Sequence, residues 1–319
     1  MSVEDRRVWR AAPATLVLVV VFMLVAAVAV PLLAYLVWVD QHAWPVPTLL
    51  ATLSVLALGY AWRFGLHPRL TADASGLTVV NPFSRHHFGW DDVRVIAPGE
   101  NGLVIASPDD RAEAWCVQKS NTATRRGRLT RADRVTRELF DLLEEHDPPL
   151  EDEDSGLRIR RARPDESRVL TRLERAAGEE ALAHVFPAEQ HPFPVTEVTR
   201  RWRRLLRDAQ VRVLVLELEG DPVGYVAYDT DTVRHLGVLP AHTRRGYGTA
   251  LLQLATTDIF EGGAPRAQLW VLVEAAAARA FYRSLGWRET EDRRDAEFPP
   301  EPAELRMERR NPAAPRRGR

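Results

Sequence analysis

The sequence TRRGYGTALLQLATTDIF, residues 243–260, decides the fold of the C-terminal half of the chain. It follows an apolar run from Val233 to Leu239 that ends at Pro240. Its own apolar residues recur at helical spacing from Ala250 to Phe260. The pattern predicts a strand, a glycine-containing turn and a helix, in that order.

The glycine turn brings several backbone N–H groups together at the start of the predicted helix, where the helix dipole adds partial positive charge. Gly246 and Gly248 let the backbone approach a phosphate oxygen without an intervening Cβ, and Arg244 and Arg245 supply charged donors. A pyrophosphate fits such a place. A G-x-G turn is also found in ordinary strand-to-helix connections, and Leu251 occupies the third glycine position of the dinucleotide fingerprint G-x-G-x-x-G.

The flanking sequence predicts a mixed sheet flanked by helices over residues 157–310. The elements expected before the turn are a strand at Leu157–Arg161, a helix opening at Pro164, a helix at Thr196–Asp208, and strands at Val211–Leu218, Val223–Tyr228 and Val233–Leu239. The elements expected after it are a strand at Leu269–Val273 and a helix at Ala276–Leu285, which carries Phe281-Tyr282 and precedes Gly286-Trp287.

This run resembles the GNAT acetyltransferase superfamily in strand order, in the Q/R-x-x-G-x-G/A acyl-CoA turn and in the closing F-Y-x-x-L-G-F/W signature. The resemblance covers nearly all of residues 157–310. It implies that the strands ending near Pro240 and Val273 splay apart and that the pantetheine arm of acetyl-CoA lies between them. Two positions depart from the pattern: Thr243 replaces the usual Gln or Arg, and Ala275 replaces an asparagine expected seven residues before the tyrosine.

The resemblance also assigns roles to individual residues. It implies that backbone groups of Leu236 and Val238 pair with the pantetheine arm and the thioester carbonyl, and that amides of residues 244–249 hold the pyrophosphate. Tyr282 matches the tyrosine that protonates the departing thiolate, and a hydroxyl of pKa about 10 is protonated at neutral pH. The expected cofactor-binding residues are Leu236, Val238, Arg244, Arg245, Gly246, Tyr247, Gly248 and Thr249. No metal site is expected.

The route by which the acceptor amine loses its proton stays open at this point. His235 lies in the strand beside the expected splay, whereas Glu217 and Asp229 lie near the ends of adjacent strands. Any of the three could act through water. We name His235 with Tyr282 as the catalytic candidates, although a strand histidine is more often a packed or surface residue. Tyr282 also has a purely structural interpretation, as a core residue of an amphipathic helix, but the glycine turn favours the catalytic one.

Two uncharged apolar runs predict a transmembrane helical hairpin within residues 1–67. They extend from Ala11 to Val39 and from Val46 to Trp62, and about 20 apolar residues suffice to cross a bilayer. We expect spans at about residues 14–38 and 46–63. Arginines precede the first span and follow the second, at positions 6, 7, 10, 63 and 69. The positive-inside rule therefore places both termini and the catalytic domain in the cytoplasm, at the bacterial inner membrane. A cleaved signal peptide is disfavoured, because the apolar region of a signal peptide has only about 7 to 15 residues and the run from Ala11 to Val39 is longer.

The segment 68–146 shows short apolar alternations broken by turns, closed by an amphipathic helix at Arg131–His146. This element order loosely resembles a small bacterial pleckstrin-homology-like domain. The basic residues 85–87 either contact anionic lipid headgroups or form a solvated turn, and the second interpretation is favoured. Cys116 is expected to be a packed small hydrophobe. The acidic, proline-containing residues 147–156 predict a linker, and residues 311–319 a basic disordered tail.

Composition excludes some classes of protein. The chain has 319 residues, 43 Lys and Arg against 44 Asp and Glu, and a net charge of -1, which gives no electrostatic case for nucleic-acid binding. A single cysteine excludes an internal disulfide and a cysteine-rich metal site. We therefore predict a multidomain protein with α+β and α/β parts: a bilayer-anchored, acetyl-CoA-dependent N-acetyltransferase acting on an unidentified amine. The alternative is a non-catalytic acyl-CoA-binding sensor or membrane scaffold.

Overall fold

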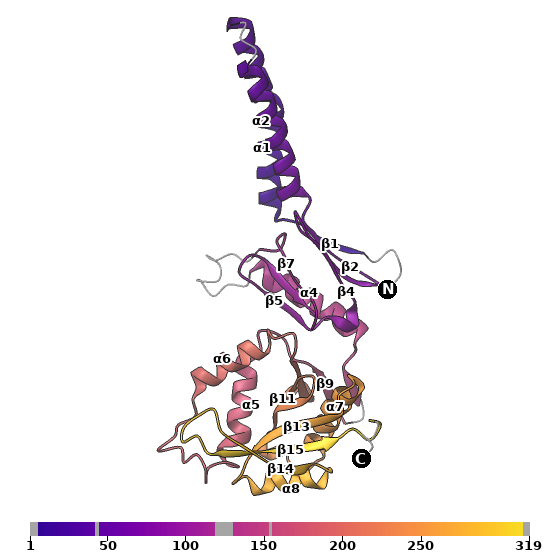
Figure 1. The fold of residues 1–319 in the computed structure, drawn as a ribbon, viewed down its shortest axis with the longest axis vertical. Coiled ribbons are helices and arrows are strands. Elements are labelled where there is room, and N and C mark those ends of the chain that lie inside the picture. The colour runs from indigo at the N-terminus through magenta and orange to yellow at the C-terminus, as the bar shows by residue number, and fades with distance from the viewer. Residues whose placement is uncertain (1–5, 42–44, 119–129, 153–154, 315–319) are drawn as a thin grey trace. The chain divides into compact units, whose positions relative to one another are not determined.

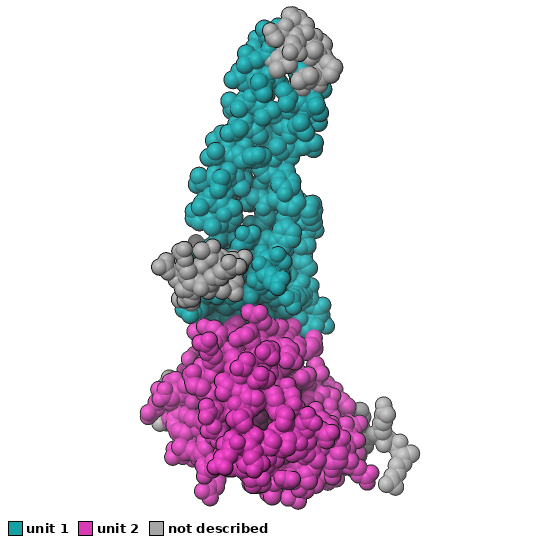
Figure 2. All heavy atoms as spheres, turned by 90° about the vertical axis from the view of Figure 1, so that its left-hand side faces the viewer, with its two compact units in different colours: residues 1–147 teal, residues 148–319 magenta. Residues whose placement is uncertain are grey.

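The protein, in a computed structural model, is described over residues 6–41, 45–118, 130–152 and 155–314. The chain divides into two compact units, residues 1–147 and residues 148–319, which Figures 1 and 2 show. The predicted multidomain architecture is confirmed: a pair of N-terminal helices, a β-rich middle and a C-terminal mixed sheet with helices. The connection 42–44 between the two helices lies outside the described residues.

The first unit opens with two long helices that lie side by side, α1 (Pro13–Gln41) and α2 (Pro45–Ala61), the second continued by a π-helical turn at Trp62–Leu66. The buried side chains of the pair are small, namely Ala26, Ala34, Ser54 and Ala61, while most of the large apolar side chains are exposed. By length and composition, Pro13–Leu36 and Pro47–Leu66 are each able to cross a membrane.

The rest of this unit consists of two antiparallel sheets and one helix. The first sheet has the order β1-β2-β3-β4, with β1 (Arg7–Trp9), β2 (Arg69–Asp73), β3 (Gly76–Val80) and β4 (Arg85–Phe88). The second contains β5 (Val95–Pro98), β6 (Leu103–Ala106) and β7 (Arg111–Ala114). Helix α4 (Arg131–His146) has the predicted bounds and begins with a capping box between Thr130 and Asp133.

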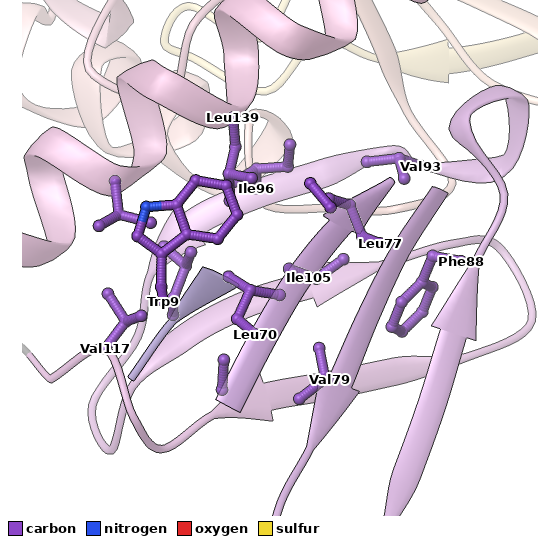
Figure 3. Close-up of a cluster of buried hydrophobic side chains, with 14 of the residues drawn as sticks. Trp9, Leu70, Leu77, Val79, Phe88, Val93, Ile96, Ile105, Val117 and Leu139 are labelled. Atoms are coloured by element: carbon purple, nitrogen blue, oxygen red, sulfur yellow. The ribbon is translucent and has the colours of Figure 1, made fainter. Parts of the chain in front are cut away.

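Figure 3 shows the apolar core of this domain, in which Leu70, Ile105 and Leu139 are fully buried. Cys116 is buried as predicted, and desolvation raises the pKa of its thiol to about 11. Strand β1 differs from the sequence prediction, because it comes from residues assigned to the hairpin and pairs with β2. Three residues are too few to show an alternating pattern, so only the long-range pairing and the Trp9 Nε1 bond to Glu138 (2.8 Å) reveal it.

The second unit is built on one eight-stranded sheet of order β14-β15-β13-β12-β11-β10-β9-β8. Its strands are β8 (Leu150–Asp152), β9 (Leu157–Arg161), β10 (Arg212–Leu218), β11 (Asp221–Tyr228), β12 (Thr232–Val238), β13 (Arg266–Leu272), β14 (Arg288–Asp295) and β15 (Ala303–Arg310). Helices α5 (Ser167–Glu179) and α6 (Val195–Leu205) pack on one face, and α7 (Tyr247–Glu261) and α8 (Ala276–Ser284) on the other.

Two sequence predictions about the ends of this unit are wrong in part. Residues 150–152, expected within a linker, form an edge strand paired with β9, and Glu151 bonds Arg158 at 2.8 Å. All three side chains are exposed, so no apolar alternation marks the strand. Asn311, expected to be disordered, donates its side-chain amide to the carbonyl of Ala264 at 3.1 Å. The arginines at 316, 317 and 319 lie outside the described residues.

A buried ion pair fixes the start of α5 against β9 and β10. Arg160, 8% exposed, donates to Glu217 at 2.6 and 2.9 Å and to Glu166 at 2.7 and 2.9 Å. Glu166 also accepts the backbone N–H of Arg163 at 2.6 Å. Both carboxylates are largely buried, so the guanidinium offsets the cost of burying their charge, and Arg158 adds a longer ion pair to Glu217 at 3.8 Å.

We predict that Arg160→Ala destabilises the second unit by about 3 to 5 kcal/mol, because the largely buried carboxylates of Glu166 and Glu217 lose their closest cation, and Arg158 lies 3.8 Å from Glu217. The matched control is Arg175→Ala, which removes an ion pair to Glu179 whose side chains are about half exposed and is expected to cost less than about 0.5 kcal/mol. Thermal unfolding of the full chain measures both. Equal shifts in Tm would contradict this account of the ion pair.

Candidate functional site

Strands β12 and β13 pair over a short stretch, at the first two residues of β12 and the third and fourth residues of β13. They run parallel, and within the described residues their pairing is limited to Thr232 with Gln268 and Val233 with Leu269. On its other side β12 pairs with β11 as far as Val238, and β13 pairs with β15 along its whole length. The two strands therefore separate toward their carboxyl ends, and we call this unpaired stretch, residues 234–238 of β12 and residues 270–272 of β13, the splay.

The hydrogen-bond alternation of β12 shows which backbone groups face the splay. The N–H of Leu239 donates to Val223 of β11 at 2.9 Å. In an antiparallel pair, alternate residues direct their N–H and C=O groups to opposite sides of the strand. Leu236 and Val238 therefore direct theirs away from β11 and into the splay. These are the two residues whose backbone the sequence predicted to bind the cofactor arm.

Helix α7 begins at Tyr247, three residues earlier than predicted, and its start is uncapped. Its N-cap residue is Gly246, with φ of 89°, a left-handed conformation that favours glycine, and no side chain of the described residues caps the helix. The N–H groups of Tyr247, Gly248 and Thr249 lie in the first turn, where no intrahelical acceptor exists. Arg244 and Arg245 are exposed beside them. Together with the helix dipole, these donors favour an anion.

Gly248 places the start of α7 beside the splay. A Cβ built on it would lie 3.8 Å from a methyl carbon of Val238 and 3.6 Å from the ring of Phe281 in α8. These are ordinary van der Waals distances, so packing within the protein does not require glycine here. The end of β12, the start of α7 and helix α8 therefore meet at one place.

Tyr282 reaches this region from α8. It packs, as Leu236 and Val238 do, against the cluster of buried apolar residues on the α7 face, and its ring centroid lies 5.3 Å from that of Phe281 and 6.2 Å from that of Trp287. Desolvation raises the pKa of its hydroxyl to about 12. The hydroxyl is thus protonated throughout the neutral range and is able to donate a proton.

His235 lies on the opposite face of the sheet, the one covered by α5 and α6. Its ring is 5.2 Å from that of Trp202 in α6. Desolvation, and then the positive charges of Arg201, Arg234 and Arg294, lower its pKa well below the ordinary value. The imidazole is therefore neutral at pH 7, with its lone pair available, but it is a weak base.

The structure does not bring the other two proton-route candidates to the splay. Glu217 lies on β10, two strands away from β12, and its carboxylate bonds Arg160. Asp229 lies in the turn before β12, where it accepts from the Thr232 N–H at 2.9 Å and from Arg234 at 2.6 Å. That turn is at the opposite end of β12 from Val238. Of the three candidates, only His235 lies beside the splay.

Tyr225 of β11 belongs to this site, and the sequence prediction missed it. It pairs with Gly237 of β12, and a Cβ on Gly237 would lie 2.7 to 2.8 Å from the phenol ring and hydroxyl. Only glycine at 237 lets the ring lie across β12. The ring also makes an edge contact with Trp202 at 5.3 Å. Desolvation, with smaller contributions from charged neighbours, raises its pKa well above 10 and keeps the hydroxyl neutral.

The connection between α5 and α6 packs against the apolar clusters on both faces of the sheet. Val185 is buried in the cluster on the α7 face, whereas Phe193 packs against the cluster on the α5 face. His184 Nε2 lies 3.2 Å from the carbonyl oxygen of Glu274, just after β13 ends. The connection therefore passes near the carboxyl end of β13.

The described part of the chain contains no group of three or more side chains that could hold a metal ion.

Comparison with known proteins agrees with both resemblances. Residues 173–287 match the model of the acetyltransferase (GNAT) family, and residues 67–162 match that of the bacterial PH domain. An uncharacterized N-acetyltransferase of Methanocaldococcus jannaschii is 32% identical over 108 residues, which are 29% of this chain and 48% of the relative. The chain thus spans about half the length of that relative.

An uncharacterized N-acetyltransferase of Archaeoglobus fulgidus is 31% identical over 106 residues, covering 30% of this chain and 72% of the relative. Among solved structures, a GCN5-related N-acetyltransferase from Rhodopseudomonas palustris is 20% identical with a TM-score of 0.43, and the match covers 48% of this chain and 94% of that one.

We predict that Gly246→Ala weakens coenzyme A binding at least about fivefold, because a left-handed alanine costs about 1 to 2 kcal/mol and turns the following N–H groups. The control is Gly263→Ala, just after the other end of α7, where φ is also 89° and a Cβ would likewise meet open space. It imposes the same backbone strain away from the site. Calorimetry with coenzyme A on the full chain compares them, and equal losses of affinity would place the anion site elsewhere.

Proposed function

Because this chain belongs to the acetyltransferase (GNAT) family, we propose that its second unit binds acetyl-CoA at the splay and transfers the acetyl group to an amine. One observation carries the proposal: the open backbone of Leu236 and Val238 and the uncapped start of α7 lie together beside Gly248. The backbone of Leu236 and Val238 can pair with the amide groups of the pantetheine arm, and the N–H groups at the start of α7 can hold the diphosphate.

The cofactor is held chiefly by backbone groups in this proposal. The N–H groups of residues 247–249 and the positive end of the helix dipole face the diphosphate, and Arg244 and Arg245 add charged donors at its exposed side. Since the contacts are mostly to the backbone, Thr243 in place of Gln or Arg changes little. Ala275, 8% exposed and packed in the core, removes one polar group near the arm without opening a hole.

The transfer forms one C–N bond and breaks one C–S bond. As the amine attacks the thioester, the carbonyl oxygen gains negative charge, and the N–H of Val238 can donate to it. The sulfur leaves as a thiolate and takes the proton of the Tyr282 hydroxyl. The hydroxyl pKa of about 12 exceeds that of a free thiol, but a thiolate leaving into the same buried place is itself desolvated, which raises its pKa and narrows the difference.

The amine nitrogen loses its proton on the other face of the sheet. Once the C–N bond has formed, the nitrogen is positively charged and far more acidic than a free ammonium, so a weak base is sufficient. The neutral imidazole of His235 is our candidate to take this proton. The hydroxyl of Tyr225, neutral and held over Gly237, can accept a hydrogen bond from the incoming amine and orient it.

We further propose that α1 and α2 anchor the enzyme in the bacterial inner membrane, with the catalytic unit in the cytoplasm. The large apolar side chains along both helices are exposed, and arginines flank their outer ends. Placing the active unit at a bilayer favours acceptors found there, such as amino-bearing lipids, envelope precursors or protein N-termini.

The rival function is a sensor or scaffold that binds acyl-CoA without turning it over. Two observations favour it: Ala275 in place of the asparagine, and the weak basicity of His235. It predicts coenzyme A binding with no release of thiol in the presence of any amine. A catalytic tyrosine would then have no role.

Tyr282→Phe separates the two functions. We expect kcat to fall by about 10²- to 10⁴-fold while the Kd for coenzyme A is unchanged, because the variant removes only the proton donor. Tyr228→Phe is the control, since that hydroxyl donates to Asp258 on α7, away from the splay. Thiol release from acetyl-CoA by the full chain, with a panel of lipid, sugar and peptide amines, gives the rates. Tight coenzyme A binding without turnover on the panel would support the rival.

The pH dependence of the rate tests the assigned protonation states. We expect kcat/KM to rise from pH 6 to pH 9 as the free amine deprotonates, without a fall on the alkaline side, because Tyr282 keeps its proton until about pH 12. His235, with its pKa lowered, is already neutral at pH 6 and adds no inflection there. His235→Gln should lower the rate and leave the shape of the profile unchanged. An inflection near pH 6.5 that this variant abolishes would show that the assignment is wrong.

A further inference from the structure

Aromatic side chains gather where the second apolar helix meets the β domain of the first unit. Tyr60 stacks on Phe64 with ring centroids 4.4 Å apart, and Phe64 makes an edge contact with Phe83 at 5.3 Å. Phe83 lies in the turn between β3 and β4 and is 76% exposed, while Tyr60 is 63% and Trp62 51% exposed. Such a group of exposed aromatic rings at the end of an apolar helix is typical of a membrane–water interface.

The contact with Phe64 fixes the level of Phe83 along the helix. The stretch that is apolar enough to span a membrane runs from Pro47 to Leu66, so Phe64 lies in its last turn. A ring packed against Phe64 must lie at nearly the same depth. If the helix spans the bilayer, Phe83 therefore lies in the headgroup region although it belongs to the β domain.

Charge at this place suits the same partner. The Arg63 guanidinium lies over the Phe83 ring, 5.3 Å from its centroid. At the end of a span, the guanidinium of an arginine such as Arg63 can reach the level of the lipid phosphates while the aliphatic part of its side chain stays in the apolar region. Arg85, exposed at the other end of the same turn, adds a second positive charge toward anionic headgroups.

The turn that carries Phe83 is held firmly by the fold. The Asn81 N–H donates to the carbonyl of Ser84 at 2.9 Å. The Asn81 side chain donates to the carbonyl of Glu113 at 2.8 Å and accepts the N–H of Trp115 at 3.2 Å, both at the end of β7. Phe83 is thus displayed from a rigid turn, which lowers the entropy lost when it inserts.

We propose that the turn of residues 81–84 is a lipid-binding surface that inserts Phe83 into the headgroup region of the bilayer and so fixes the orientation of the β domain. The inference rests on the proposed membrane span. It replaces the solvated turn favoured from sequence, and it assigns the contact to Phe83 and Arg63 in addition to the neighbouring basic residues. A lipid surface suits the site better than a protein partner, because the exposed rings continue the apolar surface of the two helices.

Spin-label depth measurements on the full chain test the proposal. A nitroxide is attached at one position at a time through Leu24→Cys, Phe83→Cys or Ala74→Cys, in a Cys116→Ala background, in nanodiscs of phosphatidylcholine and phosphatidylglycerol in equal parts. Leu24 is an exposed residue of α1. Ala74 is exposed in the turn between β2 and β3, at the opposite end of β3 from Phe83 and about 13 Å away along the strand. The readout is the ratio of label collisions with oxygen to collisions with a water-soluble nickel complex.

We expect oxygen collisions to dominate at position 24 and nickel collisions at position 74, with a ratio between these two at position 83, as a label at the headgroup level meets both reagents. If oxygen collisions dominate at position 24 and nickel collisions dominate at position 83, the lipid contact of Phe83 is overturned and the membrane anchor stands. If nickel collisions dominate at position 24, both the lipid contact and the membrane anchor are overturned. Oxygen at both 83 and 74 would show immersion of the whole domain and contradict a contact confined to the turn. A label at 83 shielded from both reagents and broadened by a second spin would show a dimer contact instead.

Discussion

The central physical feature of the second unit is a set of backbone N–H and C=O groups that have no strand partner at the splay. A sheet that separates between two central strands exposes N–H and C=O groups inside the molecule, and such groups cost free energy unless a partner satisfies them. Here Leu236 and Val238 face the splay, and the N–H groups of the first turn of α7 lie beside them. An extended ligand with amides along its length and a diphosphate at one end satisfies both sets. In the proposed complex, the cofactor completes the hydrogen bonding that the fold leaves open.

The two faces of the sheet carry different groups beside the splay. In the proposed mechanism, the α7 and α8 face supplies the diphosphate site and the protonated hydroxyl of Tyr282, whereas the α5 and α6 face supplies the neutral groups of His235 and Tyr225. Burial explains all three protonation states, because it disfavours the charged form of each group. The reaction then needs no charged side chain at the transfer point, and the thioester carbonyl becomes the main place where charge develops.

The sequence predicted the elements around the glycine turn well, because strand alternation, Pro240 and Gly246 each mark a boundary. Tyr282, Leu236 and Val238, which it named as candidates, pack against one apolar cluster in the structure, and their roles stay predictions. It missed Tyr225, since the ring's position depends on its pairing with Gly237, and register is a long-range property. It also missed β1 and β8, which are three-residue edge strands without an apolar pattern. Glu217 resembled a catalytic acid or base in sequence but is neutralised by Arg160, fifty-seven residues away in the chain.

The claim that residues 244–249 and the open edge of β12 bind one ligand can be tested at the backbone itself. Amide hydrogen exchange of the full chain, followed by mass spectrometry with and without coenzyme A, reports which N–H groups gain a partner. The account predicts slower exchange in peptides covering residues 236–239 and 244–250, and unchanged exchange in β8, β9 and the whole first unit. Protection that appears elsewhere, or none at the start of α7, would contradict it.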